Sequence, residues 1–152
     1  MVVIIDSSNN FLRGLFMALT SESRILIVDD EPSIRILLSR KLHNDGYHCM
    51  EAYDFHSAST ILNNFPLKLV ITDINMPGGS GIELLTAIKR KWTATSVIMM
   101  TGDSKFNKTA TDCIKIGAAE FITKPFDINK LARSVRQILS MTGEQTNGPV
   151  CA

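Results

Sequence analysis

The sequence has no apolar stretch long enough to cross a membrane. A spanning helix needs roughly 18 consecutive apolar residues, and no run in this 152-residue chain approaches that length. The amino terminus also lacks a basic region followed by a hydrophobic stretch, and Asp6 interrupts its short apolar run. These absences predict a protein that remains in the cytoplasm.

The sequence also lacks an excess of charge of either sign. Lys and Arg total 16 and Asp and Glu total 15, which gives a formal net charge of +1. Such a balance creates no global field that would draw the chain to nucleic acid or to a membrane surface. Lys130, Arg133 and Arg136 recur at helical spacing, and we interpret them as a solvated or protein-docking face without direct nucleic-acid contact.

Cysteine and histidine are few and widely spaced. The three cysteines form no CxxC pair, and neither they nor the three histidines have the spacing of a zinc site or a catalytic triad. We therefore predict reduced thiols and no zinc site.

What the sequence does contain is a regular alternation of short apolar runs and helical patterns between residues 24 and 141. Runs rich in Val, Ile and Leu are typical of strands buried on both faces of a parallel sheet. Pro32 and Asp127 mark helix starts, and Gly46 marks a helix stop. The expected strands are residues 24–30, 47–52, 67–73, 97–101 and 120–124, and helices are expected over residues 32–45, 55–65, 82–88, 106–117 and 127–138.

This alternation predicts one α/β domain with a doubly wound parallel sheet of five strands. Right-handed crossovers between successive parallel strands place helices on both faces of such a sheet. The common order for five strands is 2-1-3-4-5, in which the first and third strands are neighbours. Polar groups that end these two strands should therefore lie side by side.

Polar side chains do stand at the ends of four of the five expected strands. They are, in chain order, Asp29, Asp30, Asp73, Thr101 and Lys124. Because functional groups collect outside the carboxyl ends of parallel strands, we expect these side chains to meet in one crevice. Carboxylate oxygens suit a hard divalent cation, and an ammonium suits phosphoryl oxygens. The pattern predicts a combined divalent-cation and phosphoryl site.

Four segments at these strand ends resemble a known family. They are IVDDEP at residues 27–32, ITDINMPG at 71–78, MMTG at 99–102 and FITKPF at 121–126. From about Arg24 to Met141, the chain resembles a receiver domain of the two-component response regulators, similar to the chemotaxis regulator and flavodoxin-like in fold. The resemblance covers the whole predicted domain and rests on four motifs in the correct order.

The resemblance implies that Asp73 is a phosphoacceptor, and its carboxylate is a suitable nucleophile for phosphoryl transfer. The phosphoryl donor would be a histidine kinase or a histidine phosphotransfer protein, and the cofactor would be Mg²⁺. Asp30 and Asp73 are suited to direct ligation of the ion, Asp29 to a water-mediated contact and Asn75 to ligation through its backbone carbonyl. Without the metal, we expect like-charge repulsion to raise one or more of the carboxylate pKa values.

Lys124 would pair with the phosphoryl oxygens. An ion pair of Lys124 with Asp29 is the open alternative, and the resting protein can have both. Receivers use the turn after this lysine to aim it at the site, so we expect the Lys124–Pro125 peptide bond to be cis.

Thr101 and Phe121 are the predicted switch residues. The Thr101 hydroxyl would donate a hydrogen bond to the new phosphoryl group, and Phe121 would then rotate inward. An ordinary packed core aromatic is the alternative for Phe121. The expected output surface consists of the helix over residues 106–117, the last strand and the last helix.

These residues predict a signalling phosphoacceptor that catalyses only its own phosphorylation and dephosphorylation. A pseudo-receiver that acts only as a scaffold, or a receiver excised from a longer regulator, are the alternatives, and the oligomeric state stays open between monomer and dimer. An aspartyl phosphatase of the haloacid dehalogenase type would want a DxD motif, whereas position 75 holds Asn.

The two ends of the chain lie outside the resemblance. Residues 1–23 contain an apolar stripe that would form a docking helix over residues 10–19, and their pattern resembles that of residues 26–42; a chance similarity between two short amphipathic patterns is the favoured alternative. Residues 142–152 have few apolar side chains and are predicted to be a flexible tail or a cut linker.

Overall fold

A computed structural model describes residues 24–102 and 107–142 of the chain. The predicted docking segment in residues 1–23, Phe106, and the tail after residue 142 lie outside the described residues, so the statements about them stay predictions. No helix in the described ranges combines the length and the apolar character that crossing a membrane requires.

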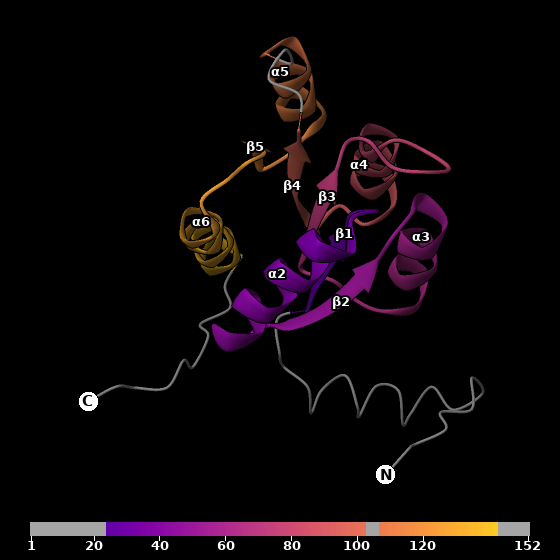
Figure 1. The fold of residues 1–152 in the computed structure, drawn as a ribbon. Coiled ribbons are helices and arrows are strands. Elements are labelled where there is room, and N and C mark those ends of the chain that lie inside the picture. Colours follow the sequence, from indigo (N-terminus) through magenta and orange to yellow (C-terminus); the bar gives the residue numbers. More distant parts are fainter. Residues whose placement is uncertain (1–23, 103–106, 143–152) are drawn as a thin grey trace, which may run out of the picture.

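Five parallel strands form one sheet in the order β2-β1-β3-β4-β5 (Figure 1). The strands are β1 (Arg24–Val28), β2 (His48–Ala52), β3 (Leu69–Asp73), β4 (Ser96–Thr101) and β5 (Glu120–Thr123). The helices between and after them are α2 (Pro32–Asn44), α3 (Phe55–Asn64), α4 (Gly81–Lys91), α5 (Asn107–Ile116) and α6 (Ile128–Met141). The predicted fold class and strand order are therefore confirmed.

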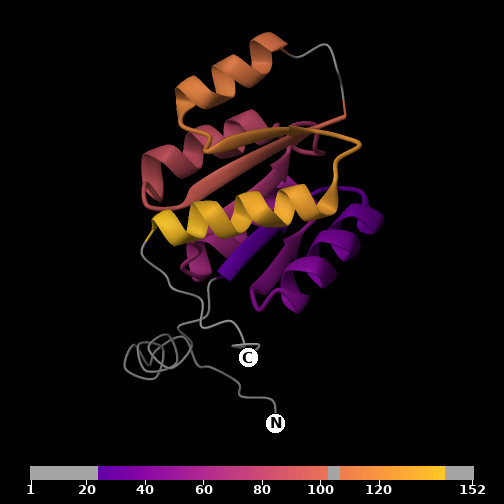
Figure 2. The same ribbon diagram turned by 90° about the vertical axis from the view of Figure 1, so that its left-hand side faces the viewer.

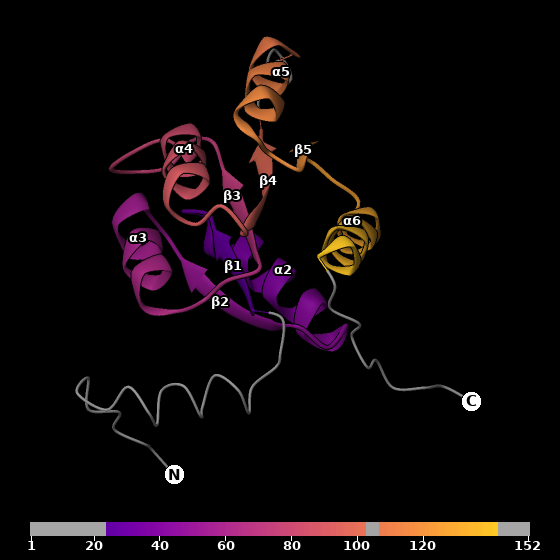
Figure 3. The ribbon, with the colours of Figure 1, turned by 180° about the vertical axis from the view of Figure 1, so that it is seen from behind.

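The helices cover the sheet in two layers. Helices α2 and α6 pack on one face, while α3, α4 and α5 pack on the other (Figures 1 and 3). Figure 2, a view of the α6 side, shows α6 lying across the sheet with α2 beside it, and the two helices are in contact. Strand β1 supplies Leu26 and Val28 to one core and Ile25 and Ile27 to the other. This two-sided burial explains why the central strands are continuous apolar runs.

Local sequence signals set the helix starts. Asp54 accepts a hydrogen bond from the backbone of Ser57 at the start of α3, and Ser80 does the same for Glu83 at the start of α4. The predicted cap Asp127 accepts hydrogen bonds from the two backbone N–H groups that open α6. These caps fix where the loops before α3, α4 and α6 end.

A glycine determines the path of the loop after β3. Helix α4 begins at Gly81, one residue before the predicted start at Ile82, and the Gly81 N–H donates to the carbonyl of Ile74 at 2.8 Å. A Cβ at Gly81 would overlap the carbonyl oxygen of Asp73 and lie 2.9 Å from the Cα of Ile74. Only glycine permits this close approach of α4 to the end of β3.

Candidate functional site

The predicted carboxylates meet at the carboxyl edge of the sheet. Strands β1 and β3 are neighbours, and Val28 pairs with Thr72, so the next residues, Asp29 and Asp73, fall side by side. Asp29, Asp30 and Asp73 each place a carboxylate oxygen within 4.8 Å of those of the other two. Asp29 and Asp73 are buried, whereas Asp30 is exposed. The cluster is therefore held firmly on its inner side and is open to solvent on its outer side.

Lys124, which directly follows β5, reaches across the sheet to this cluster. Its Nζ donates to Asp29 Oδ2 at 2.6 Å and to Asp73 Oδ2 at 3.0 Å, and it lies 3.4 Å from Glu31 Oε1. Its backbone N–H donates to the carbonyl of Thr101, and the peptide bond between Lys124 and the following proline is cis. The lysine thus bridges two of the carboxylates. The predicted alternative was an ion pair with Asp29 alone, whereas the structure also has a bond to Asp73.

Burial and charge shift the pKa values of this cluster in opposite directions. Burial raises the pKa of Asp29 above 3.8. The hydrogen bonds from Lys124 and from the Glu31 backbone lower this pKa but do not outweigh burial. Repulsion by Asp73 also raises the pKa and is the smallest of these contributions. The expected rise in a carboxylate pKa is present, but burial rather than like-charge repulsion is its main cause. For Lys124, burial lowers the pKa, and its hydrogen bonds to Asp29 and Asp73 outweigh that effect and raise it above 10.5.

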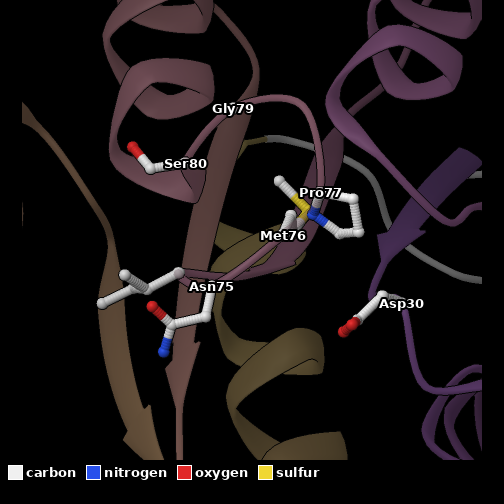
Figure 4. A pocket seen from close by; sticks show the side chains of 7 residues that line it. Asp30, Asn75, Met76, Pro77, Gly79 and Ser80 are labelled. Carbon is white, nitrogen blue, oxygen red and sulfur yellow. The ribbon is translucent and has the colours of Figure 1, made fainter.

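An open pocket adjoins the exposed side of the cluster. It has a volume of about 480 Å³ and is lined by Asp30, Ile74, Asn75, Met76, Pro77, Gly79 and Ser80. Figure 4 shows the Asp30 carboxylate on one side of this pocket and the loop that carries Asn75, Met76 and Pro77 on the other. The backbone N–H of Asn75 also lies 3.3 Å from Asp73 Oδ1. The structure therefore brings both Asp30 and Asn75 to the solvent side of the site.

The donor set fits a hard divalent cation. Three carboxylates converge on one point, and Mg²⁺ prefers oxygen ligands while retaining several waters. The exposed face beside Asp30 leaves room for those waters. The acidic cluster is therefore able to bind a metal ion, with Lys124 as the neighbouring positive charge.

The two predicted switch residues lie beside the site on the outer half of the sheet. Asp73 pairs with Met100 in the sheet register, so Thr101, which ends β4, lies one residue beyond the level of Asp73. Thr101 is fully buried. Phe121 pairs with Met99 in β5 and is partly buried against the core under α3, α4 and α5. Phe121 therefore packs on the core in this structure, while its predicted rotation concerns a second state.

Two residues of the site have no predicted role in the sequence analysis. Glu31 approaches Lys124, and its backbone N–H donates to Asp29 Oδ1 at 2.9 Å. Arg35, one turn into α2, donates from Nη1 to the backbone carbonyl of Asp29 at 2.7 Å. Both residues follow the Asp29–Asp30 pair closely in sequence, and this closeness could have indicated their part in the site. The first turn of α2 passes the end of β1, so side chains on that turn lie near the carboxylates.

The family follows from a comparison with known proteins. The description "Response regulator receiver domain" belongs to the family model that matches residues 25–136. The chain belongs to this family. It is therefore a receiver domain of the kind used in two-component signalling, a signalling module rather than a classical enzyme, and the predicted resemblance is confirmed.

Curated relatives and solved structures agree with this assignment. The chain is 35% identical over 131 residues to the response regulator protein PilR of Pseudomonas aeruginosa, covering 86% of this chain and 29% of PilR. It is 37% identical over 119 residues to the aerobic respiration control protein ArcA of Escherichia coli, covering 78% of this chain and 49% of ArcA. The chain thus spans about half or less of the length of these relatives.

The solved receiver domains superpose over nearly their whole length. The receiver domain of NtrX from Brucella abortus shares 35% identity and a TM-score of 0.72, with 76% of this chain and 98% of that chain covered. The chemotaxis response regulator CheY4 of Vibrio cholerae shares 26% identity and a TM-score of 0.72, with 78% and 99% covered. The similarity is thus confined to the receiver and matches the fold described above.

Proposed function

We propose that this receiver accepts a phosphoryl group on Asp73 from a phosphohistidine protein in a Mg²⁺-dependent step, and that the modification switches a protein-docking surface. The observation that carries the proposal is the position of the Asp73 carboxylate between Lys124 and Asp30. This carboxylate lies against the Lys124 ammonium on one side and beside Asp30 on the open side. Family membership supports a histidine kinase or a histidine phosphotransfer protein as the donor.

In the transfer step, a carboxylate oxygen of Asp73 forms a bond to phosphorus while the bond from phosphorus to the donor's imidazole nitrogen breaks. The electron pair of that bond remains on the nitrogen that carried phosphorus, and because the other ring nitrogen carries a proton throughout, the imidazole leaves as a neutral ring. Such a transfer depends on positioning and charge neutralisation more than on acid-base chemistry. Lys124 supplies one fixed positive charge, since its raised pKa keeps it an ammonium at neutral pH.

Four residues would hold the metal ion. Asp30 and Asp73 would bind it directly, Asp29 through water and Asn75 through its backbone carbonyl. When bound, Mg²⁺ supplies positive charge beside the phosphoryl oxygens. Two observations support this assignment: the three carboxylates converge on one point, and Asn75 lines the same open pocket as Asp30.

Switching would begin at Thr101, which lies one residue beyond the partner of Asp73 on β4. Its hydroxyl donates to a new phosphoryl oxygen, and Phe121 rotates inward in response. The output surface would be the face of α5, β5 and α6, and α5 carries two exposed apolar side chains, Ile114 and Ile116, which are exposed by 48% and 37%. Exposed apolar side chains of this kind support docking of a downstream protein or of a second copy in the cytoplasm.

The curated relatives are longer than this chain, which supports the proposal that this receiver acts as part of a longer regulator. A scaffold without phosphorylation is the other candidate. It would be favoured by a lost site residue, and Asp29, Asp30, Asp73 and Lys124 are all present in the cluster.

The test is chemical. Incubation with acetyl phosphate and Mg²⁺ should add one phosphoryl group, detected by intact mass, and excess EDTA should prevent it. Asp73→Asn should abolish the labelling, whereas Asp112→Asn, a change at an exposed carboxylate on α5, should leave it intact. Labelling of Asp73→Asn at the same site, or full labelling in EDTA, would refute the assignment.

A further inference from the structure

The Arg35 guanidinium connects three elements at the edge of the acidic cluster. Its Nη1 donates to the backbone carbonyl of Asp29 at 2.7 Å, and its Nε lies 3.4 Å from Glu51 Oε2 on β2. The Arg35 side chain is only 16% exposed. One partly buried cation therefore links the start of α2, the residue after β1 and the outer strand β2.

The bond to Asp29 matters because of which carbonyl it uses. The carbonyl of Asp29 and the N–H of Asp30 belong to the same planar peptide unit. A donor that fixes the direction of this carbonyl also fixes the rotation of the unit, and with it the direction in which the Asp30 side chain leaves the backbone. Asp30 is exposed, so few packed neighbours orient it.

The other carboxylates have their own restraints. Asp29 is buried and bonded to Lys124, and Asp73 is buried and bonded to the same ammonium. Asp30 shares neither restraint, and its backbone is held through Arg35. An ion pair with Glu51 explains the position of Arg35 less well than its bond to Asp29 does. The contact with Glu51 is longer, and the Glu51 side chain is 38% exposed. Exposed ion pairs contribute little to stability.

We propose that Arg35 is a positioning residue for the metal site: it holds the Asp29–Asp30 peptide so that Asp30 faces the cation. This inference rests on the proposed Mg²⁺-dependent function. Arg35 itself contacts neither the ion nor the phosphoryl group. Residues that orient metal ligands typically contribute about 10- to 100-fold to metal affinity.

The decisive experiment measures Mg²⁺ binding to the metal-free protein by NMR titration. Arg35→Gln should weaken binding about tenfold, while Arg40→Gln, a matched change at an exposed position of the same helix, should bind as the unmodified protein does. Before any Mg²⁺ is added, the amide ¹⁵N signal of Asp30 should already shift in Arg35→Gln and stay in place in Arg40→Gln. A merely structural role would not move that single amide selectively.

Two further variants keep the test decisive if Arg35→Gln folds poorly. Arg35→Lys keeps one donor and should bind Mg²⁺ with an affinity between those of the unmodified protein and Arg35→Gln. Glu51→Gln removes the ion pair but keeps the bond to Asp29, so it should change Mg²⁺ affinity less than twofold. In acetyl phosphate labelling, Arg35→Gln should raise the Mg²⁺ concentration that gives half the maximal rate. The rate at saturating Mg²⁺ should fall by a smaller factor.

The outcomes separate this inference from the proposed function. Unchanged Mg²⁺ affinity in both Arg35 variants, or an equal loss in Glu51→Gln, would overturn the positioning role while the unmodified protein still binds Mg²⁺ and is labelled. If the unmodified protein neither binds Mg²⁺ nor is labelled, the proposed function itself fails.

Discussion

The centre and the outer edge of the sheet differ in how firmly they hold their residues. Every residue of β1 and β3 is buried, and the Asp29 and Asp73 carboxylates at their ends share one lysine. Strand β5 has one neighbouring strand, and none of its residues is fully buried. Phosphoryl transfer needs fixed groups and switching needs groups that can move, so we assign the chemistry to the centre and the readout to the edge.

Lys124 joins the two regions. It directly follows the edge strand, yet its ammonium lies at the ends of the central ones. A change in the charge of the site therefore acts directly on the residue that follows β5.

Truncation of a buried side chain should destabilise the central strand more than the edge strand. Ile71 in β3 is fully buried and Ile122 in β5 only partly so, and both pack against the same core under α2 and α6. Ile71→Ala should lower the free energy of unfolding by about 4 kcal/mol and Ile122→Ala by about 2 kcal/mol or less. Urea unfolding with matched m-values measures both. Equal losses would mean that the edge is held as firmly as the centre.

Removing the lysine that joins the regions should have the next largest effect. Lys124→Met leaves the Asp29 and Asp73 carboxylates buried without their counter-charge, which should cost about 3 kcal/mol in the metal-free protein. Added Mg²⁺ should recover part of this loss, because the cation replaces the missing charge. Lys130→Met, at an exposed position of α6, is the control and should be nearly neutral. A loss that Mg²⁺ leaves unchanged would argue that Lys124 acts through packing alone.

The sequence predicted most of this central region for a simple physical reason. Strands buried on both faces must be continuous apolar runs, so the first polar residue after each run marks the strand end. Asp29, Asp73 and Thr101 were placed in this way, and the strand order then brought the two carboxylates together. The resemblance supplied the roles of these residues.

What the sequence could not predict depends on the path of the loops. Glu31 and Arg35 act through contacts of long side chains whose direction is set by how α2 leaves β1. The sequence predicts a helix that starts at residue 82, but α4 starts at Gly81, and this glycine is required where α4 approaches the end of β3. The main cause of the raised Asp29 pKa was also misjudged, because burial is a property of the packed structure and repulsion can be inferred from spacing alone.

Thr101→Ala should separate chemistry from readout. Asp73 should still be phosphorylated, because the hydroxyl is not the nucleophile. The phosphorylation-dependent shift of the two-state equilibrium should weaken by about 1.5 to 3 kcal/mol, the contribution of one hydrogen bond to a charged group. NMR signals around Phe121, compared with and without phosphorylation, measure this shift. Unchanged shifts would show that another group couples the centre to the edge.

The Asp29 carboxyl should give the centre of the sheet a modest pH-dependent contribution to stability. Because burial raises the pKa of Asp29 above 3.8, the metal-free folded protein binds a proton there more readily than the unfolded chain does. This carboxyl therefore favours the folded state fully below pH 3.8, and that contribution is lost as the pH rises through the raised pKa. Asp29→Asn cannot titrate, so the unmodified protein should gain stability relative to it as the pH falls from 7 toward 4.

Urea unfolding in EDTA at several pH values measures this difference, and a carboxylate away from the site gives a control of opposite sign. Hydrogen bonds from the Ser57 side chain and backbone lower the pKa of Asp54 below 3.8. The advantage of the unmodified protein over Asp54→Asn should thus stay level between pH 7 and pH 5 and disappear only as the pH falls through that lowered pKa. If the unmodified protein instead loses stability relative to Asp29→Asn on acidification, pairing with Lys124 outweighs burial at Asp29, and the centre is held by its charges more than by its packing.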